Sequence, residues 1–279
     1  MFRIQAETDL NGDGYMTDNL RLGACQFAVT GDIKYNIRKI EDAIYRASEL
    51  HVDLLAFPEC ALTGYPPINL THVKPDFSKI NAEIDRIRCM VNKTGVACLV
   101  GSVAEEQGKQ YNRSYFIIPG GSAQYYDKRI LGGWDAEYFC EGKNKGIFTW
   151  KEYRFAVRIC FEIRFPELFR EIYREECDFI VAQFYDTSVT DNPEYYSIIR
   201  SHLSTRAAEN LTPILSVNTN SPFQEAPTAF VDSDGIIMDE AARGTDTILI
   251  HNFRGRGVTA SGERRRKWID RMFLQNEHY

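Results

Sequence analysis

Apolar and polar residues recur along the chain with two different periods. Apolar side chains three and four residues apart predict amphipathic helices. Ile33, Ile37 and Ile40 illustrate this spacing near the start of the first helical segment. The helical period occurs over residues 32–50, 77–93, 166–176 and 193–210.

Short runs of apolar and β-branched residues lie between the helical segments and predict strands. They cover residues 20–29, 52–59, 96–103, 111–119, 123–128, 146–150, 153–160, 178–184, 212–218, 227–232, 235–240 and 246–252. Strands and helices alternate, but several strands follow one another directly. This order predicts an α/β protein whose sheets are mixed rather than purely parallel.

The 279 residues, of which 44% are hydrophobic, suffice for one large α/β domain or two small ones. We expect a single domain over residues 20–279, preceded by a polar, glycine-rich extension over residues 1–19. Residues 9–20, DLNGDGYMTDNL, begin like a calcium-binding loop. Leu20 occupies the twelfth position, where such a loop needs a bidentate acid. An ordinary turn is therefore favoured over a calcium site.

The bulk charge and the cysteines limit the classes of partner and compartment. A net charge of −6 disfavours general attraction to nucleic acid or to anionic membranes. The basic cluster at residues 264–267 is read as part of a solvated tail. No run approaches the roughly 20 apolar residues that span a bilayer, and the N-terminal residues lack the apolar core of a signal peptide. Seven cysteines, an odd number without a C-x-x-C pair, favour a reducing compartment, so we expect a cytoplasmic protein.

One cysteine follows an apolar run and is surrounded by charge. Residues 156–168 read AVRICFEIRFPEL, and Cys160 stands where a strand would turn into a helix that begins near Pro166. Such a turn exposes a side chain at the sheet edge and directs backbone N–H groups to the same place. Cys160 is therefore a candidate nucleophile, although a buried structural cysteine is the commoner alternative.

A nucleophilic thiol needs a base. None of the five histidines stands at a comparable strand end. Glu59 does, since it follows the apolar run in VDLLAFPE. The carboxyl ends of strands are where α/β sheets present functional groups. Glu59 is a candidate general base, with a helix-capping acid as the alternative.

A lysine ends the tyrosine-rich strand in the stretch YYDKRIL. Beside Cys160, the ammonium group of Lys128 would favour the thiolate and the oxyanion of a tetrahedral intermediate. On its own, a lysine at such a position is more often on the surface.

The chain resembles the nitrilase superfamily, the carbon–nitrogen hydrolases, in three motifs and in their order along the sequence. These are FPE with Glu59, YDK with Lys128 and ICFEIRFPE with Cys160. LTGYPP, YNRSYFI, RAAENLTPILSVN and VDSDG extend the resemblance over roughly residues 21–251. The wording ALTGYPP is similar to glutamine-hydrolysing amidase domains of NAD synthetases, although no Gly-rich nucleotide loop is visible.

The resemblance implies a four-layer αββα sandwich with two mixed β-sheets. It implies that Glu59 accepts the proton of Cys160, that Cys160 forms a thioester acyl-enzyme, and that Lys128 and the backbone N–H of Phe161 hold the oxyanion. A second acid is usual between the lysine and the cysteine. Glu137 is the preferred candidate, with Asp135 as the alternative.

The expected reaction is hydrolysis of a non-peptide C–N bond in a small amide or N-carbamoyl compound, without metal or organic cofactor. The alternatives are nitrile hydrolysis, acyl transfer to an amine, and a catalytically idle binding protein of the same fold. The expected substrate contacts are Tyr65, Arg164, Phe184 and Tyr185. Tyr65 also fits core packing, and Arg164 also fits a structural ion pair with Glu167 or another acid. The resemblance also implies a homodimer or higher homo-oligomer, built through a helix layer.

Overall fold

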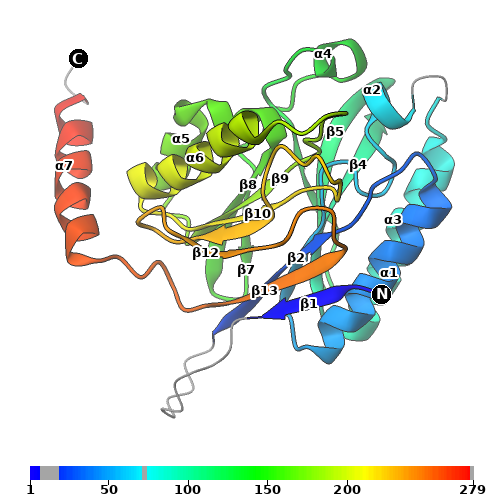
Figure 1. Cartoon of the computed structure of the whole chain (residues 1–279), viewed down its shortest axis with the longest axis horizontal. Helices are drawn as coiled ribbons and strands as arrows, with labels where there is room; N and C mark the ends of the chain where they lie inside the picture. Colours follow the sequence, from blue (N-terminus) through cyan, green and yellow to red (C-terminus); the bar gives the residue numbers. More distant parts are fainter. Residues whose placement is uncertain (7–18, 71–73, 277–279) are drawn as a thin grey trace.

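The computed structural model describes residues 1–6, 19–70 and 74–276. Two β-sheets lie face to face, with helices α1 and α3 on the outer side of one and helices α5 and α6 on the outer side of the other (Figure 1). Most of the loop considered for calcium, including Asp9, Asn11 and Asp13, lies outside the described residues.

Both sheets contain parallel and antiparallel strand pairs. The first has the strand order β1-β13-β2-β3-β4-β5-β6, and the second has the order β12-β11-β10-β9-β8-β7. The strands of the first sheet are β1 (Arg3–Ala6), β2 (Leu20–Gln26), β3 (Leu54–Ala56), β4 (Ala97–Glu106), β5 (Lys109–Ile117), β6 (Gln124–Asp127) and β13 (Thr247–Phe253). Those of the second are β7 (Ile147–Trp150), β8 (Tyr153–Ile159), β9 (Phe179–Gln183), β10 (Ile214–Val217), β11 (Ala229–Val231) and β12 (Ile237–Glu240).

The long helices begin and end at residues suited to those positions. Asp32 and Asp76 accept backbone hydrogen bonds at the N-termini of two of them, and Gly95 ends the second in the left-handed conformation, with φ of 79°. The helices are α1 (Ile33–Glu49), α2 (Pro66–Asn69), α3 (Phe77–Thr94), α4 (Asp135–Tyr138), α5 (Pro166–Arg174), α6 (Pro193–Asn210) and α7 (Ala260–Asn276), together with the 3₁₀ turn η1 (Cys160–Arg164).

Strands buried on both faces explain why the sandwich has four layers. In β9, Phe179 and Val181 enter the core between the sheets, whereas Ile180 and Ala182 pack toward α5 and α6. Strand β3 does the same on the other side, because Leu54 faces the partner sheet and Leu55 faces α1 and α3. Successive side chains of a strand point to opposite faces, so one short apolar run contributes to two cores. The predicted αββα sandwich is confirmed.

Several elements were not predicted, among them a strand near one end of the described chain and a helix near the other. Residues 3–6 pair with β13 as a parallel edge strand, although most of this strand is exposed and shows no apolar alternation. The basic segment near the C-terminus, expected to be a solvated tail, forms α7, which stands apart from the sheets at the left of Figure 1. Its apolar residues are sparse, and Trp268 remains 62% exposed, so the hydrophobic period there is weak.

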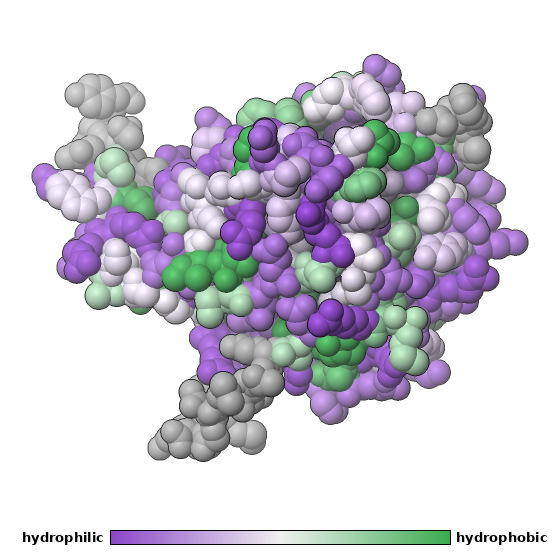
Figure 2. Space-filling view, viewed as in Figure 1, coloured by the Kyte–Doolittle hydropathy of each residue, from purple (hydrophilic) through white to green (hydrophobic). Residues whose placement is uncertain are grey.

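Polar side chains predominate on the face of the molecule shown in Figure 2, and apolar ones gather in small separate patches. Among the residues described, no helix is long and apolar enough to cross a bilayer.

The buried carboxylate of Glu162 joins the ends of two strands from different sheets. Its Oε2 accepts a hydrogen bond from the N–H of Ile159, at the end of β8, at 2.7 Å. Its Oε1 accepts bonds from the N–H of Arg129, just beyond β6, and from the hydroxyl of Tyr126, both at 2.7 Å. A charged acceptor that satisfies several buried donors stabilises a fixed arrangement of the segments that carry them. Glu162 thus fixes the relative position of the segments that precede Cys160 and follow β6.

Replacing Glu162 by Gln should lower the free energy of unfolding by about 3 kcal/mol, because the amide group turns an N–H donor toward buried donors and removes the charge. Urea denaturation followed by circular dichroism measures this. Glu167→Gln makes the same change at an exposed position of the next helix and should cost less than about 0.5 kcal/mol. Equal effects of the two substitutions would contradict the bridging role of Glu162.

Candidate active site

A hollow of about 310 Å³ opens where β3, β6, β8 and β9 end. Of the residues expected at the site, the hollow is lined by Tyr65, Lys128, Cys160, Phe161, Arg164 and Tyr185. Asp135 and Asp186 also line it, although the sequence favoured neither for the site. Segments distant in the chain therefore converge on one space large enough for a small molecule.

Cys160 begins the 3₁₀ turn that follows β8 and has a left-handed backbone, with φ of 48°. A non-glycine residue in this region is strained, and such strain is often found at functional sites. Burial raises the pKa of the Cys160 thiol well above its usual value, the charge of Glu59 adds to this, and Lys128 opposes it. The thiol is therefore protonated at rest. Phe161 is in the first turn, where N–H groups have no partner within the helix.

Glu59 is fully buried and held by three donors. Its Oε1 accepts hydrogen bonds from Lys128 Nζ at 2.9 Å and Asn112 Nδ2 at 2.6 Å, and its Oε2 accepts one from the N–H of Tyr185 at 2.9 Å. Burial raises the pKa of this carboxyl group above its usual value, although Lys128 opposes the shift. A raised pKa suits a carboxylate that must take up a proton from a thiol. Asn112, on β5, was not predicted as a site residue.

The loop that carries Glu59 lies directly on β4. A Cβ atom at Gly101 would be 2.3 Å from the carbonyl oxygen of Pro58 and 2.5 Å from the nitrogen of Cys60. Only glycine permits this approach without a shift of the backbone. From the other sheet, Gln183 Nε2 donates a hydrogen bond to the carbonyl of Phe57 at 2.6 Å. Both sheets thus fix the loop.

Lys128 is fully buried between two carboxylates. Its Nζ is 2.9 Å from Glu59 Oε1 and 2.6 Å from Asp135 Oδ2. Burial alone would lower the pKa of this ammonium group, but the negative charges of Glu59 and Asp135 outweigh burial and raise the pKa well above its usual value. Lys128 is therefore a fixed positive charge in the hollow.

Besides Glu59, the acid that contacts Lys128 is Asp135. Glu137, the preferred candidate for this second acid, is exposed. Both residues are in the short helix α4. Residues two positions apart in a helix are separated by about 200° around its axis and therefore point to nearly opposite sides. Asp135 shares the buried face with Phe139, four residues later. The hydroxyl of Tyr65 donates to Asp135 Oδ1 at 2.7 Å and fixes the carboxylate.

The aromatic residues expected at the substrate occupy different places. Tyr65 and Tyr185 stack in the hollow, with ring centroids 5.2 Å apart. Phe184 lies instead in the core beneath α5 and α6, because it points to the opposite face from Tyr185. Its backbone oxygen accepts a hydrogen bond from the N–H of Glu59 at 3.2 Å.

Arg164 lines the hollow and is engaged with a neighbouring tyrosine. Its Nη2 donates to the hydroxyl of Tyr195 at 2.5 Å, and the guanidinium carbon is 5.2 Å from the centre of that ring. Glu167 is exposed, and within the described part of the chain no ion pair joins it to Arg164.

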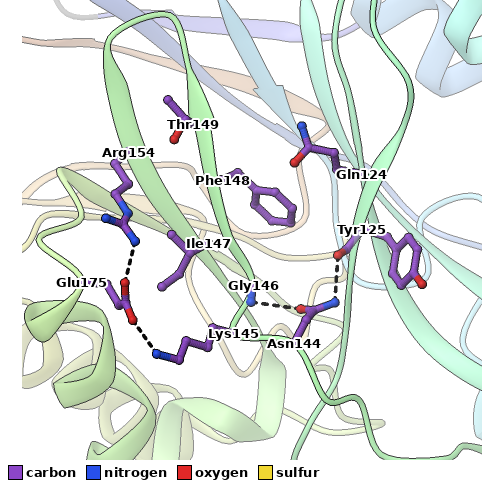
Figure 3. A pocket seen from close by; sticks show the side chains of 10 residues that line it. All are labelled: Gln124, Tyr125, Asn144, Lys145, Gly146, Ile147, Phe148, Thr149, Arg154 and Glu175. Carbon is purple, nitrogen blue, oxygen red and sulfur yellow. Dashed lines mark hydrogen bonds and ion pairs between the residues drawn. The ribbon is translucent and has the colours of Figure 1, made fainter.

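A second hollow lies beside the hairpin of β7 and β8 (Figure 3). Its charged groups pair with one another, because Lys145 and Arg154 both contact Glu175 at 2.5 Å. No cysteine lines it. The described residues contain no cluster of three or more His, Cys, Asp or Glu side chains that could hold a metal ion. The groups capable of covalent chemistry therefore converge in the hollow at Cys160.

A family model for carbon-nitrogen hydrolases matches residues 21–259. An (R)-stereoselective amidase from Pseudomonas sp. is 27% identical over 189 residues, which are 67% of this chain and 66% of the amidase. A glutamine-dependent NAD(+) synthetase from Synechocystis sp. is 32% identical over 152 residues, or 50% of this chain and 27% of the synthetase. Among solved structures, an amidase from Nesterenkonia sp. AN1 has a TM-score of 0.72 at 20% identity and covers 83% of this chain and 91% of its own.

Lys128→Met should lower the free energy of unfolding by about 3–5 kcal/mol at pH 8, because it leaves two buried carboxylates without their cation. The raised pKa of Glu59 should rise further, so the folded state binds more protons than the unfolded state above the usual glutamate pKa of 4.5. Stability should therefore fall as the pH rises, and the loss should be smaller at pH 5 than at pH 8.

Urea denaturation at both pH values measures this difference. Lys145→Met removes a lysine that is 57% exposed and paired at the surface, and it should cost at most about 1 kcal/mol at either pH. A loss for Lys128→Met that does not change with pH would mean that the two carboxylates do not depend on this ammonium group.

Proposed function

The chain belongs to the carbon-nitrogen hydrolase family, and we propose that it hydrolyses the C–N bond of a small amide through a thioester on Cys160. One observation carries the proposal. Cys160 and Lys128 line the same hollow, and Lys128 Nζ is hydrogen-bonded to Glu59 at 2.9 Å. A nucleophile and a fixed cation in one hollow, with a base hydrogen-bonded to that cation, are the groups that acyl transfer needs.

In the first half of the reaction, the sulfur of Cys160 attacks the amide carbon while its proton moves to Glu59. The carbonyl electrons become an oxyanion, which the ammonium of Lys128 and the N–H of Phe161 stabilise. The C–N bond then breaks, and the leaving nitrogen takes the proton from Glu59. The products of this step are ammonia or an amine and a thioester with Cys160.

In the second half, Glu59 removes a proton from a water molecule as its oxygen attacks the thioester carbon. The intermediate collapses, the sulfur leaves and recovers a proton from Glu59, and a carboxylic acid is released. Covalent catalysis divides one difficult hydrolysis into two easier steps. Asp135 acts as the second acid by holding the ammonium of Lys128 in place, the role first considered for Glu137.

The relatives favour an amide over a nitrile as the substrate. The Pseudomonas relative is an amidase, and the Nesterenkonia structure shows acrylamide added to the active-site cysteine of an amidase with this fold. The raised pKa of Glu59 supports its role as the base for Cys160. The odd number of cysteines supports action in the cytoplasm.

We further propose that the protein forms homodimers or larger assemblies through the layer of α5 and α6. Ile198 on α6 is 49% exposed and supplies apolar surface there. Light scattering of the purified protein that gives the mass of a single 279-residue chain would contradict this assembly.

Cys160→Ala should lower the turnover number for a small amide such as butyramide by about 10⁴-fold or more, because the acyl-enzyme can no longer form. Glu59→Gln should lower it by about 10²–10⁴-fold, because the thiol loses its base. Ammonia release measures both rates. Cys89→Ala removes an exposed thiol and should change the rate by less than about twofold.

Mass spectrometry of the wild-type protein during turnover should show the acyl group on Cys160. Added hydroxylamine should divert part of it to a hydroxamate, and diversion to amines at the expense of hydrolysis would identify an acyltransferase instead. Hydrolysis of a nitrile but of no amide would identify a nitrile hydrolase. Full activity of Cys160→Ala would disprove the mechanism.

The role of the second acid has its own test, which compares two positions in one short helix. Asp135→Asn should lower the turnover number by about 10²-fold, because the ammonium of Lys128 loses a charged acceptor and shifts. Glu137→Gln makes the same change on the exposed side and should leave activity within about twofold. Steady-state kinetics of both variants show which residue is the second acid. A larger loss of turnover in Glu137→Gln than in Asp135→Asn would assign that role to Glu137.

A further inference from the structure

Asp186 follows β9 and lines the hollow beside Cys160 without a part in the proposed reaction. Its backbone is held on both sides. Its N–H donates to Asn218 Oδ1 at 2.9 Å, and its carbonyl accepts bonds from Asn218 Nδ2 at 2.8 Å and from the N–H of Glu225 at 2.9 Å. The carboxylate is therefore presented to the hollow from a fixed point.

The carboxylate of Asp186 differs from the other acids near the thiol. Glu59 and Asp135 both contact Lys128, whereas within residues 1–6, 19–70 and 74–276 the carboxylate of Asp186 has neither a hydrogen bond nor an ion pair. Asp186 is half-buried, and an acid partly withdrawn from water without a partner bears part of the cost of ionisation there. A ligand that supplies the missing positive charge would relieve this cost.

The charges around Asp186 come from several elements. Burial raises the pKa of its carboxyl group to about 7, and Glu225 and Glu59 contribute in the same direction. Arg164 and Lys128 oppose the shift but do not cancel it. Lys128 already serves two carboxylates, and Arg164 is bonded to the hydroxyl of Tyr195 and lies over its ring. Of the two acids that line the hollow, Asp135 is paired with Lys128, whereas Asp186 has no direct contact with a positive group among the described residues.

The remaining walls of the hollow suit a cation as well. Tyr65 and Tyr185 line the hollow, whereas Arg164 already lies over the ring of Tyr195. The face of an aromatic ring attracts ammonium and guanidinium groups, and the attraction strengthens where water is excluded. A carboxylate together with aromatic rings forms a site for a positively charged ligand.

We propose that Asp186 is a specificity-determining residue that binds an ammonium or guanidinium group, so that the substrates are small amides carrying a positive charge. The assignment rests on the proposed amidase function and specifies its substrate class. An anionic substrate would be repelled by the carboxylate of Asp186, and a neutral substrate would leave this carboxylate without a partner.

The charge preference of the hollow can be measured without turnover. Methanethiosulfonate reagents that carry an ethylammonium or an ethylsulfonate group form a disulfide with a thiolate and release methanesulfinate. Peptide mass mapping follows modification of Cys160, and exposed Cys89 serves as the internal reference. With rates normalised to Cys89, Cys160 should react about tenfold or more faster with the cationic than with the anionic reagent at pH 8. Asp186→Asn should reduce this preference to below about threefold.

Substrate selectivity gives the second readout. Specificity constants for 4-aminobutyramide, butyramide and succinamate compare a cation, a neutral amide and an anion of similar size. The cation should be favoured over the neutral amide by about tenfold or more at pH 8, and the ratio should fall toward one in Asp186→Asn. Asp191→Asn removes the same charge from an exposed acid paired with Arg243 and should leave the ratio unchanged.

The pH dependence separates charge from shape. Because the pKa of Asp186 is raised to about 7, its carboxylate gains protons as the pH falls from 8 to 6. The preference for the cation should therefore decline over this range in the wild type and stay flat in Asp186→Asn. Arg164, Lys128, Glu59 and Glu225 face the same carboxylate, and a decline that persists in Asp186→Asn would assign the titration to one of them.

The outcomes distinguish the two proposals. If no amide is hydrolysed, the proposed function fails. If amides are hydrolysed and the wild type shows no preference for the cation, the assignment of Asp186 fails alone. If Asp186→Asn does not fold, the wild-type ratios for reagents and amides still decide, because equal rates for cation and anion overturn the assignment.

Discussion

A single buried ammonium group holds together the two acids on which this site depends. Lys128 Nζ contacts Glu59 at 2.9 Å and Asp135 at 2.6 Å, and all three side chains are nearly inaccessible to water. Removing three charges from water is unfavourable unless their geometry is fixed and their remaining hydrogen bonds are made. Asn112, Tyr65 and the N–H of Tyr185 make those bonds. The arrangement therefore needs a rigid body around it.

The sandwich supplies that rigidity because each group stands at the end of a buried strand. The two sheets share one core, and their strand ends meet on one side of it. Glu162 connects the end of β8 to the segment after β6, and Gln183 connects β9 to the loop after β3. The thiol and the ammonium group thus keep their relation through bonds between elements that are distant in sequence.

The strand ends explain how much of the site could be predicted from the sequence. Glu59, Lys128 and Cys160 each follow a strand. The alternation of side chains along a strand and the position of its end determine to which side the next side chain points. The choice between Asp135 and Glu137 depended on the phase of a four-residue helix, which has too few apolar positions to define a face. Tyr185 and Phe184 are neighbours on opposite faces, and only the pairing of β9 shows which one meets the hollow.

Other features had no signal of their own. Asp186 follows a strand like the other site residues, but whether an acid lacks a partner depends on side chains from other elements. The sandwich itself was predictable because strands buried on both faces give continuous apolar runs. Helix α7 was not, because few apolar residues mark its period. Sequence pattern thus defines what is buried, and tertiary contacts define which buried charges are compensated.

The balance of charges also explains why the thiol rests in its protonated form. A permanent thiolate would add a negative charge to a site where Glu59, Asp186 and Asp135 already oppose the charge of Lys128. In the proposed reaction, keeping the proton on sulfur until a carbonyl is in place limits the negative charge at any moment, because the proton would pass to Glu59 as the oxyanion forms beside Lys128. A positively charged substrate would reduce the same excess as it binds. The unpaired acid and the protonated thiol are in this sense two consequences of one constraint, a buried site with more carboxylates than cations.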